Sequence, residues 1–269
     1  MDIKPQYRIV LIYLIIGVLW IFLSDIAVHS LFERKDDVTF VQNVKGWFYI
    51  LITGALLFLL IKKDVSQITK LNTDLIKSYE QTITGWVRVM DLRHKETKDH
   101  SLRVANMTLE LAKLSGITQK TELEYIKRGA ILHDIGKIGI PDGILIKPAK
   151  LNEEEWAQIK THPQIAHNLL SDIEFLSPRI SIPYCHHEKW DGSGYPQGLR
   201  AEGIPLEARI FAIIDVWDAL IHPRVYKSAW PEDRVLKHIE EQGGKHFDPK
   251  LVKTFLENYE QIKRNSVIS

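Results

Sequence analysis

Two long runs of apolar residues stand near the start of the chain. One covers 9–23 and the other covers 47–61. Each run is shorter than the ~20 residues that span a bilayer, and apolar or snorkelling residues at the flanks supply the missing length. The pattern predicts two transmembrane helices, at about 8–28 and 45–61, joined by a short outside loop over 33–46.

The charges that flank the second apolar run orient the predicted pair of helices. Lys62 and Lys63 follow this run directly, and an excess of Lys and Arg marks the cytoplasmic side of a membrane. We therefore expect 1–63 to be a multi-pass anchor in the inner membrane, with everything that follows in the cytoplasm. A cleaved signal peptide over the first run is the alternative, although Ala27-Val-His29 is a poor cleavage site.

Apolar residues at three- and four-residue steps continue over 64–93, where no proline interrupts them. This spacing is typical of an amphipathic helix. Its first part, 64–82, favours a coiled-coil linker that joins two copies of the chain in a parallel homodimer. The alternative is a helix packed on the domain that follows. From 83 onward we assign the helix to a soluble domain covering 83–269.

The soluble part shows helical periodicity and no alternation of strands with helices, so we predict an all-α fold. Capping signals, Thr121 with Glu124 and Asn152 with Glu155, mark the starts of two helices. The stretch 188–206 is rich in Gly and Pro and is predicted to be a loop. Further helices are predicted at 207–221, 231–242 and 249–262.

Composition excludes several classes of function. The chain has 269 residues with a formal net charge of +1 and no basic stripe, so nothing indicates a nucleic-acid partner. Its one cysteine, Cys185, excludes a disulfide framework and a zinc site built from several cysteines.

A histidine and an aspartate stand side by side at 133 and 134, within the apolar stretch 131–137 that we predict to be a buried helix. Burying an imidazole beside a carboxylate is costly unless a partner pairs them, and Fe, Mn or Zn suits both ligands. Lys137 follows His133 by four residues and is predicted on the same helix face, where a cation could hold a phosphate. A simple hydrogen bond between His133 and Asp134 in a protein core is the alternative.

More ligand-capable side chains occur in apolar or Gly-rich settings. Glu96 and His100 are four residues apart and are predicted to share a helix face, while Asp215 ends the apolar run 210–214. With His133 and Asp134 the remaining candidates are His162, His186 and His187. One metal cluster explains eight such residues in an all-α domain better than eight unrelated structural roles do.

The segments that carry these residues resemble the HD-GYP domain, a branch of the HD metal-dependent phosphohydrolases. The matching segments span about 83–259 and include Glu96-Thr-Lys-Asp-His100, His133-Asp-Ile-Gly-Lys137 and His186-His-Glu-Lys-Trp-Asp-Gly-Ser-Gly-Tyr-Pro196. The resemblance implies a helical bundle around two or three divalent metal ions, iron first and manganese as the alternative. It also implies hydrolysis of cyclic di-GMP to the linear dinucleotide pGpG and then to GMP, by a hydroxide that bridges the metals.

Site roles carry over from the resemblance residue by residue. The implied metal ligands are His133, Asp134, His162, His186, His187 and Asp215, with Glu96 and His100 supporting a third ion. Lys137 and Asp134 are the implied catalytic residues, and Lys137 contacts the phosphate. The implied substrate-binding residues are Gly194, Tyr195 and Pro196, which also offer a contact for a diguanylate cyclase or another signalling partner, together with Arg224 and Lys227.

The run His222-Pro-Arg-Val-Tyr-Lys227 departs from the family pattern, in which the proline stands after the arginine. This departure bears on substrate affinity rather than on the chemistry. Two other functions stay open: a phosphodiesterase for another cyclic dinucleotide such as cyclic GMP-AMP, and a receptor that binds cyclic di-GMP without hydrolysing it. The intact ligand set favours an enzyme.

Overall fold

A computed structural model describes residues 5–31, 35–94, 100–173, 175–176, 180–223 and 228–264. Within these ranges the regular structure is helical, apart from an isolated bridge between Gly243 and Phe247. The all-α prediction is therefore confirmed. The chain separates into two compact units, Met1–Gln81 and Thr82–Ser269.

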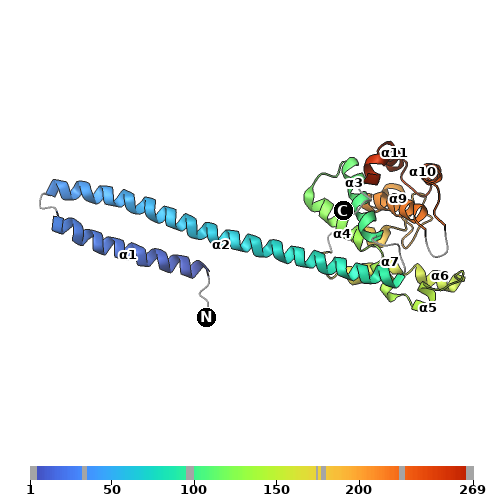
Figure 1. The fold of residues 1–269 in the computed structure, drawn as a ribbon, viewed down its shortest axis with the longest axis horizontal. Coiled ribbons are helices and arrows are strands. Elements are labelled where there is room, and N and C mark those ends of the chain that lie inside the picture. The colour runs from blue at the N-terminus through green and yellow to red at the C-terminus, as the bar shows by residue number, and fades with distance from the viewer. Residues whose placement is uncertain are drawn as a thin grey trace. The chain divides into compact units, whose positions relative to one another are not determined.

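The N-terminal unit consists of α1 (Pro5–Leu31) and the first part of α2 (Lys35–His94), which lie alongside each other (Figure 1). Both helices are long and apolar enough to cross a membrane. Ion pairs connect them: Arg8 Nη2 lies 2.5 Å from Asp64 Oδ1, and Lys45 pairs with Asp25. The unit thus places two apolar helices side by side with polar contacts between them.

The predicted outside loop over 33–46 is wrong from residue 35 onward, because α2 begins at Lys35. Val38, Val41 and Val44 continue the spacing of an apolar helix face, and no proline stands in this segment. Nothing in the sequence therefore ends the helix before the second apolar run.

The C-terminal unit packs its helices around α9 (Leu206–Ile221), as Figure 1 shows. Phe211, Ile213, Ile214 and Trp217 of α9 are almost fully buried, and burying each such side chain stabilises the fold by about 1.5–3 kcal/mol. The other long helices of this unit are α3 (His100–Leu114), α4 (Lys120–Ile131), α7 (His162–Leu170), α10 (Glu232–Glu241) and α11 (Pro249–Glu257).

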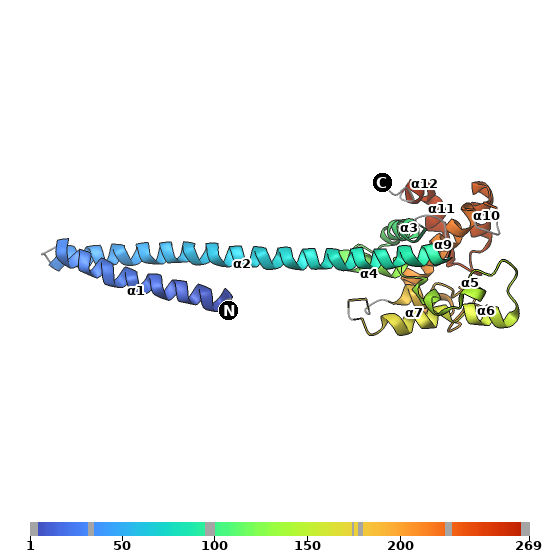
Figure 2. The same ribbon diagram turned by 60° about the horizontal axis from the view of Figure 1, so that its bottom comes forward.

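Shorter helices complete the unit. They are α5 (Asp142–Leu145), α6 (Glu153–Ile159), α8 (Ser181–Cys185), α12 (Tyr259–Arg264) and the 3-10 helices η1 (Ile135–Gly139) and η3 (Ala201–Gly203). Helices α5 and α6 lie next to each other at one edge of the unit in both views (Figure 2). The last predicted helix is divided, because α11 ends before Asn258 and α12 begins after it.

The two predicted helix caps have different outcomes. The capping box of α6 is confirmed, since Asn152 accepts from the Glu155 amide and Glu155 accepts from the Asn152 amide. The box at Thr121 is wrong: the N-cap of α4 is Gln119, two residues earlier, and it makes no side-chain cap. Thr121 therefore lies inside the first turn, where its hydroxyl is not at the N-cap position.

Gly136 is the point where η1 approaches the backbone of α7. A Cβ atom there would lie 1.9 Å from the His162 carbonyl oxygen and 2.7 Å from the Ala166 amide nitrogen. We expect Gly136→Ala to lower the free energy of unfolding by roughly 3 kcal/mol, at the upper end of the usual cost of overpacking. Denaturant unfolding measures this, with Gly143→Ala as the control because nothing lies within 4 Å of its Cβ position. Equal stability of the two variants would contradict the close contact.

Candidate metal centre

His133 and Asp134 lie in the turn between α4 and η1, so the prediction that this pair sits on a buried helix is wrong. The α-helix ends at Ile131, and the glycines at 136 and 139 favour the tighter η1 that packs against α7. In this turn the side chains of His133 and Asp134 lie close to each other. His133 Nε2 lies 3.2 Å from Asp134 Oδ2.

Backbone carbonyl groups fix the ring orientation of each of three buried histidines. The Nδ1 atoms of His133, His162 and His186 lie 2.9, 2.8 and 3.1 Å from the carbonyl oxygen of a residue three or four positions earlier. A carbonyl oxygen only accepts hydrogen bonds, so each Nδ1 carries the proton. The Nε2 atom of each ring therefore faces the opposite side, where an unprotonated Nε2 offers its lone pair to a metal ion.

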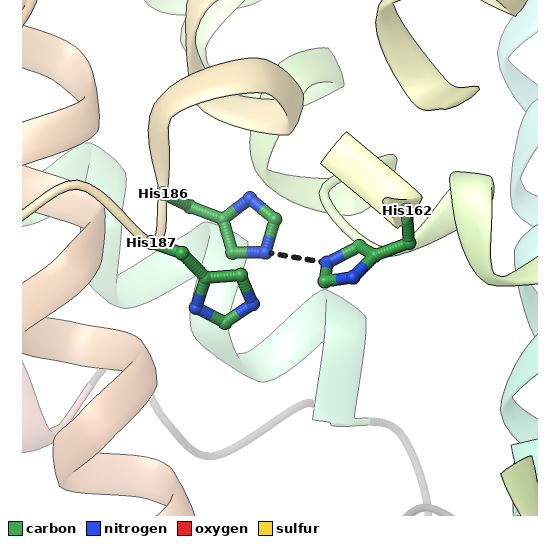
Figure 3. A group of neighbouring side chains, drawn as sticks. All are labelled: His162, His186 and His187. Atoms are coloured by element: carbon green, nitrogen blue, oxygen red, sulfur yellow. Dashed lines mark hydrogen bonds between the residues drawn. The ribbon is translucent and has the colours of Figure 1, made fainter. Parts of the chain in front are cut away.

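His162, His186 and His187 form one trio of ligand atoms, all within 4.8 Å of one another. Figure 3 shows their rings converging, with the contact between His162 and His186 dashed. The two Nε2 atoms of that contact are 3.3 Å apart. Two lone pairs at this distance repel each other, and a cation between them would be coordinated by both.

Burial supports the neutral state of this trio. It lowers the pKa of His187 to about 3 and the pKa values of His162 and His186 below their ordinary range. Neutral imidazole is the form that binds metal ions. The donor set therefore fits a divalent metal ion.

His100, His133 and Asp215 form a second trio, also within 4.8 Å of one another. Asp215 comes from α9 as predicted, and its Oδ1 lies 3.7 Å from His100 Nε2. His100 is almost fully buried. Its ring is therefore shielded from solvent beside His133 and Asp215.

Asp134 reaches both trios. Its Oδ1 lies 3.4 Å from His162 Nε2 and 3.8 Å from His186 Nε2, while its Oδ2 faces His133. Asp134 could therefore contribute a carboxylate oxygen to a cation held by either trio. Lys137 forms an ion pair with the same Oδ2 atom.

The carboxylates dominate the electrostatics at this end of the cluster. Burial acts to raise the pKa of Asp134, but Lys137 and His133 outweigh it and hold that pKa well below its usual range. Burial likewise acts to lower the pKa of His133, but Asp134 and Asp215 raise it to about 9. A bound cation would take over the role of the proton on His133, since metal binding releases protons from its ligands.

The sequence pattern did not single out two residues that support the cluster, Asp218 and Arg103. The Nδ1 of His100 donates to Asp218 Oδ2 at 2.7 Å, and Arg103 Nε donates to Asp218 Oδ1 at 2.6 Å. A buried carboxylate behind a histidine fixes its tautomer and its orientation toward a metal. The available signal was spacing, because Asp218 and Arg103 each follow a predicted ligand by three residues on the same helix.

The loop 188–200 borders the His162, His186 and His187 trio. The Tyr195 ring stacks on His187 with centroids 4.7 Å apart, and the peptide bond from Tyr195 to Pro196 is cis. Glu188, another residue that the sequence did not single out, is buried and accepts from the amides of Gln197 at 2.7 Å and Leu199 at 3.0 Å. The loop is thus folded back on the segment after α8, which supplies His186 and His187.

Of the predicted site residues, the structure brings together His100, His133, Asp134, Lys137, His162, His186, His187, Tyr195 and Asp215. Gly194 and Pro196 flank Tyr195 in the loop. Glu96, Arg224 and Lys227 lie outside the described residues.

Comparison with known proteins gives one family and several relatives. A family model described as "HD domain" matches residues 64–251. The chain is 39% identical over 194 residues to 3'3'-cGAMP-specific phosphodiesterase 2 of Vibrio cholerae, covering 71% of this chain and 37% of that relative. It is 40% identical over 186 residues to the cyclic di-GMP phosphodiesterase response regulator RpfG of Xanthomonas campestris, covering 68% of this chain and 49% of that relative.

A solved structure shares the fold. The cyclic GMP-AMP specific phosphodiesterase V-cGAP3 of V. cholerae superposes with a TM-score of 0.55 at 18% identity, over 70% of this chain and 50% of that one. The chain spans half or less of the length of the relatives described here.

Proposed function

The chain belongs to the HD domain family, and on that premise we propose that it hydrolyses a cyclic dinucleotide, with cyclic di-GMP as the first candidate. The resemblance inferred from the sequence is confirmed at the level of the family. One observation carries the proposal: Asp134 reaches both trios of ligand atoms while it pairs with Lys137. That arrangement suits a phosphodiester, which needs cations on its oxygens as the bond to phosphorus breaks.

We assign two divalent ions to the two trios, iron first and manganese as the alternative, because imidazole mixed with carboxylate suits these metals. Bound ions would lower the pKa of a coordinated water and withdraw charge from the phosphoryl group. Cys185 is not among the ligands; burial raises the pKa of its thiol to about 12. A third ion supported by Glu96 follows from the family resemblance alone.

The chain's own residues supply binding and charge. The Lys137 ammonium lies beside Asp134 and can transfer its contact to a phosphoryl oxygen when the substrate enters. The histidines of the first trio are neutral, so they add no positive charge beside the Lys137 ammonium group. Opening the ring of cyclic di-GMP gives pGpG, and cleavage of its remaining internal diester gives GMP.

Cyclic GMP-AMP is the second candidate substrate, because a relative 39% identical to this chain is named as specific for it. Guanine and adenine differ at the edges that hydrogen-bond, so the side chains around the base decide between them. Arg224 and Lys227 are our candidates for these contacts.

The test uses the full chain in detergent, purified without air. Iron and manganese per chain are measured first, and the turnover of cyclic di-GMP and 3'3'-cGAMP is then followed by chromatography of the products. We expect metal-dependent cleavage of cyclic di-GMP to pGpG and GMP. Faster cleavage of the mixed dinucleotide would select the second candidate. Binding to the metal-loaded protein with no cleavage of either compound would contradict the enzyme and select the receptor.

We propose that α1 and the first part of α2 anchor the chain in the inner membrane with two spans. Their apolar side chains are exposed, as a lipid-facing surface requires. We expect a reporter that is active only in the periplasm to be silent when fused after residue 269, and a cytoplasmic reporter to be active there. The reverse pattern would contradict this topology.

We also propose that residues 64–82 form a coiled coil with a second copy. Val65, Ile68, Leu71 and Leu75 lie at helical spacing and are half or more exposed in the single chain, which is costly unless a partner covers them. We expect a fragment that begins at 64 to be a dimer in light scattering and a fragment that begins at 83 to be a monomer. Two monomers at high concentration would contradict the coiled coil.

A further inference from the structure

We propose that Arg93 is a positioning residue for the reaction, holding the segment that carries Lys137. Arg93 lies in the last turn of α2, one residue before the helix ends. Its guanidinium group donates to the carbonyl oxygens of Lys137 at 3.2 Å, Ile138 at 3.2 Å and Ile140 at 2.8 Å, and pairs with Asp142 at 2.7 Å. The effect on turnover rests on the proposed function; the effect on the segment does not.

The acceptors of Arg93 are the carbonyl groups at the C-terminal end of η1. Helix ends leave their last carbonyls without partners inside the helix, and a basic side chain can supply the missing donors. A planar guanidinium group donates to several acceptors at once in a fixed geometry, which a lysine cannot do. Since the Arg93 side chain is 29% exposed, water competes only in part for these bonds.

The opposite side of η1 is fixed against α7. A Cβ on Gly136 would overlap the His162 backbone, and a Cβ on Gly139 would lie 2.9 Å from the Ile165 side chain. Between η1 and α2 the apolar packing is less complete. Met90 is buried there, but a groove of about 360 Å³ remains, and Trp86 beside it is 60% exposed. The groove is lined by Trp86, Val89, Met90, Ile135 and Ile138.

Hydrogen bonds from Arg93 therefore add a polar connection between α2 and η1 where the apolar packing beside them is open. Lys137 is held at both ends: its carbonyl oxygen accepts from Arg93, and its ammonium group pairs with Asp134. A displacement of about 1 Å at a reacting group can cost on the order of 100-fold in rate. Because α2 also carries the second apolar run, a shift of its last turn would reach Lys137 through these bonds.

The test compares Arg93→Gln, Arg93→Lys and Asp142→Asn with wild type in the full chain. Amide hydrogen exchange of peptides covering 135–142 reports on η1, and kcat, KM and metal per chain are measured on the same samples. We expect Arg93→Gln to speed exchange in 135–142 and to lower kcat by about tenfold, as expected for a misplaced group. Metal content, KM and exchange in α7 and α9 should stay near wild type.

The other two variants separate the carbonyl bonds from the ion pair. Asp142→Asn keeps all three carbonyl contacts and should match wild type in exchange and in kcat. Arg93→Lys should restore the wild-type exchange rate and kcat only in part, because an ammonium group cannot reach three carbonyls in one geometry.

Three results would overturn the proposal. In the first, Arg93→Gln leaves exchange in 135–142 unchanged. In the second, exchange rises while kcat per metal-loaded chain does not change, which leaves Arg93 as a helix cap only. In the third, Asp142→Asn reproduces Arg93→Gln. Exchange needs no substrate, so a wild type without turnover would count against the proposed function while the exchange data still decide whether Arg93 holds η1.

Discussion

Asp134→Ala should abolish hydrolysis and remove most of the bound metal. Asp134 is the carboxylate that reaches both trios, with contacts to His133, His162 and His186. Without it two cations would repel each other with less negative charge between them, and Lys137 would lose its partner. The measurement is iron and manganese per chain, by elemental analysis of protein prepared without air, together with turnover.

Three further variants sharpen this result. Asp134→Asn keeps the shape of the side chain and should also lose metal. This result would show that the loss of negative charge, and not a cavity left by the shorter side chain, empties the site. Asp233→Ala removes an exposed carboxylate on α10 and should change neither metal nor rate. Glu96→Ala should remove at most one ion and leave measurable activity. If it empties the site as fully as Asp134→Ala does, Glu96 is a ligand of the central pair.

Lys137→Ala should lower turnover by about 100-fold, the scale of losing one group that stabilises charge in the transition state. Metal content should stay at the wild-type value, because Lys137 is a cation and contributes no ligand. Its ammonium group pairs with Asp134, and we propose that a phosphoryl oxygen takes over this contact when the substrate binds. Single-turnover kinetics on metal-loaded protein measures the chemical step directly.

The matched control is Lys237→Ala, which removes an exposed lysine on α10. It should leave turnover and metal content unchanged. A rate for Lys137→Ala equal to wild type would remove this residue from the mechanism. A loss of metal would instead assign it a role in holding the charge of Asp134 during metal binding.

The sequence by itself determined the fold class and singled out most of the side chains that the structure gathers in the candidate metal centre. Helical spacing is a local property, so α9 and the helix that carries 64–93 could be predicted from it. Ligand identity is also readable locally, because a histidine or aspartate within an apolar segment needs a partner to offset burial. His133, Asp134 and Asp215 stood out for this reason.

Only the tertiary structure decided how the ligands are grouped and what holds them. The two trios join residues from distant parts of the chain, and no periodicity encodes which histidine faces which. The structure has a turn and η1 where a helix was predicted over 131–137, because Gly136 packs against the α7 backbone. Asp218 behind His100, and Arg93 at the end of η1, likewise act through contacts between segments far apart in the sequence. Such contacts exist only once the chain has folded, because their partners are set by packing and not by local spacing.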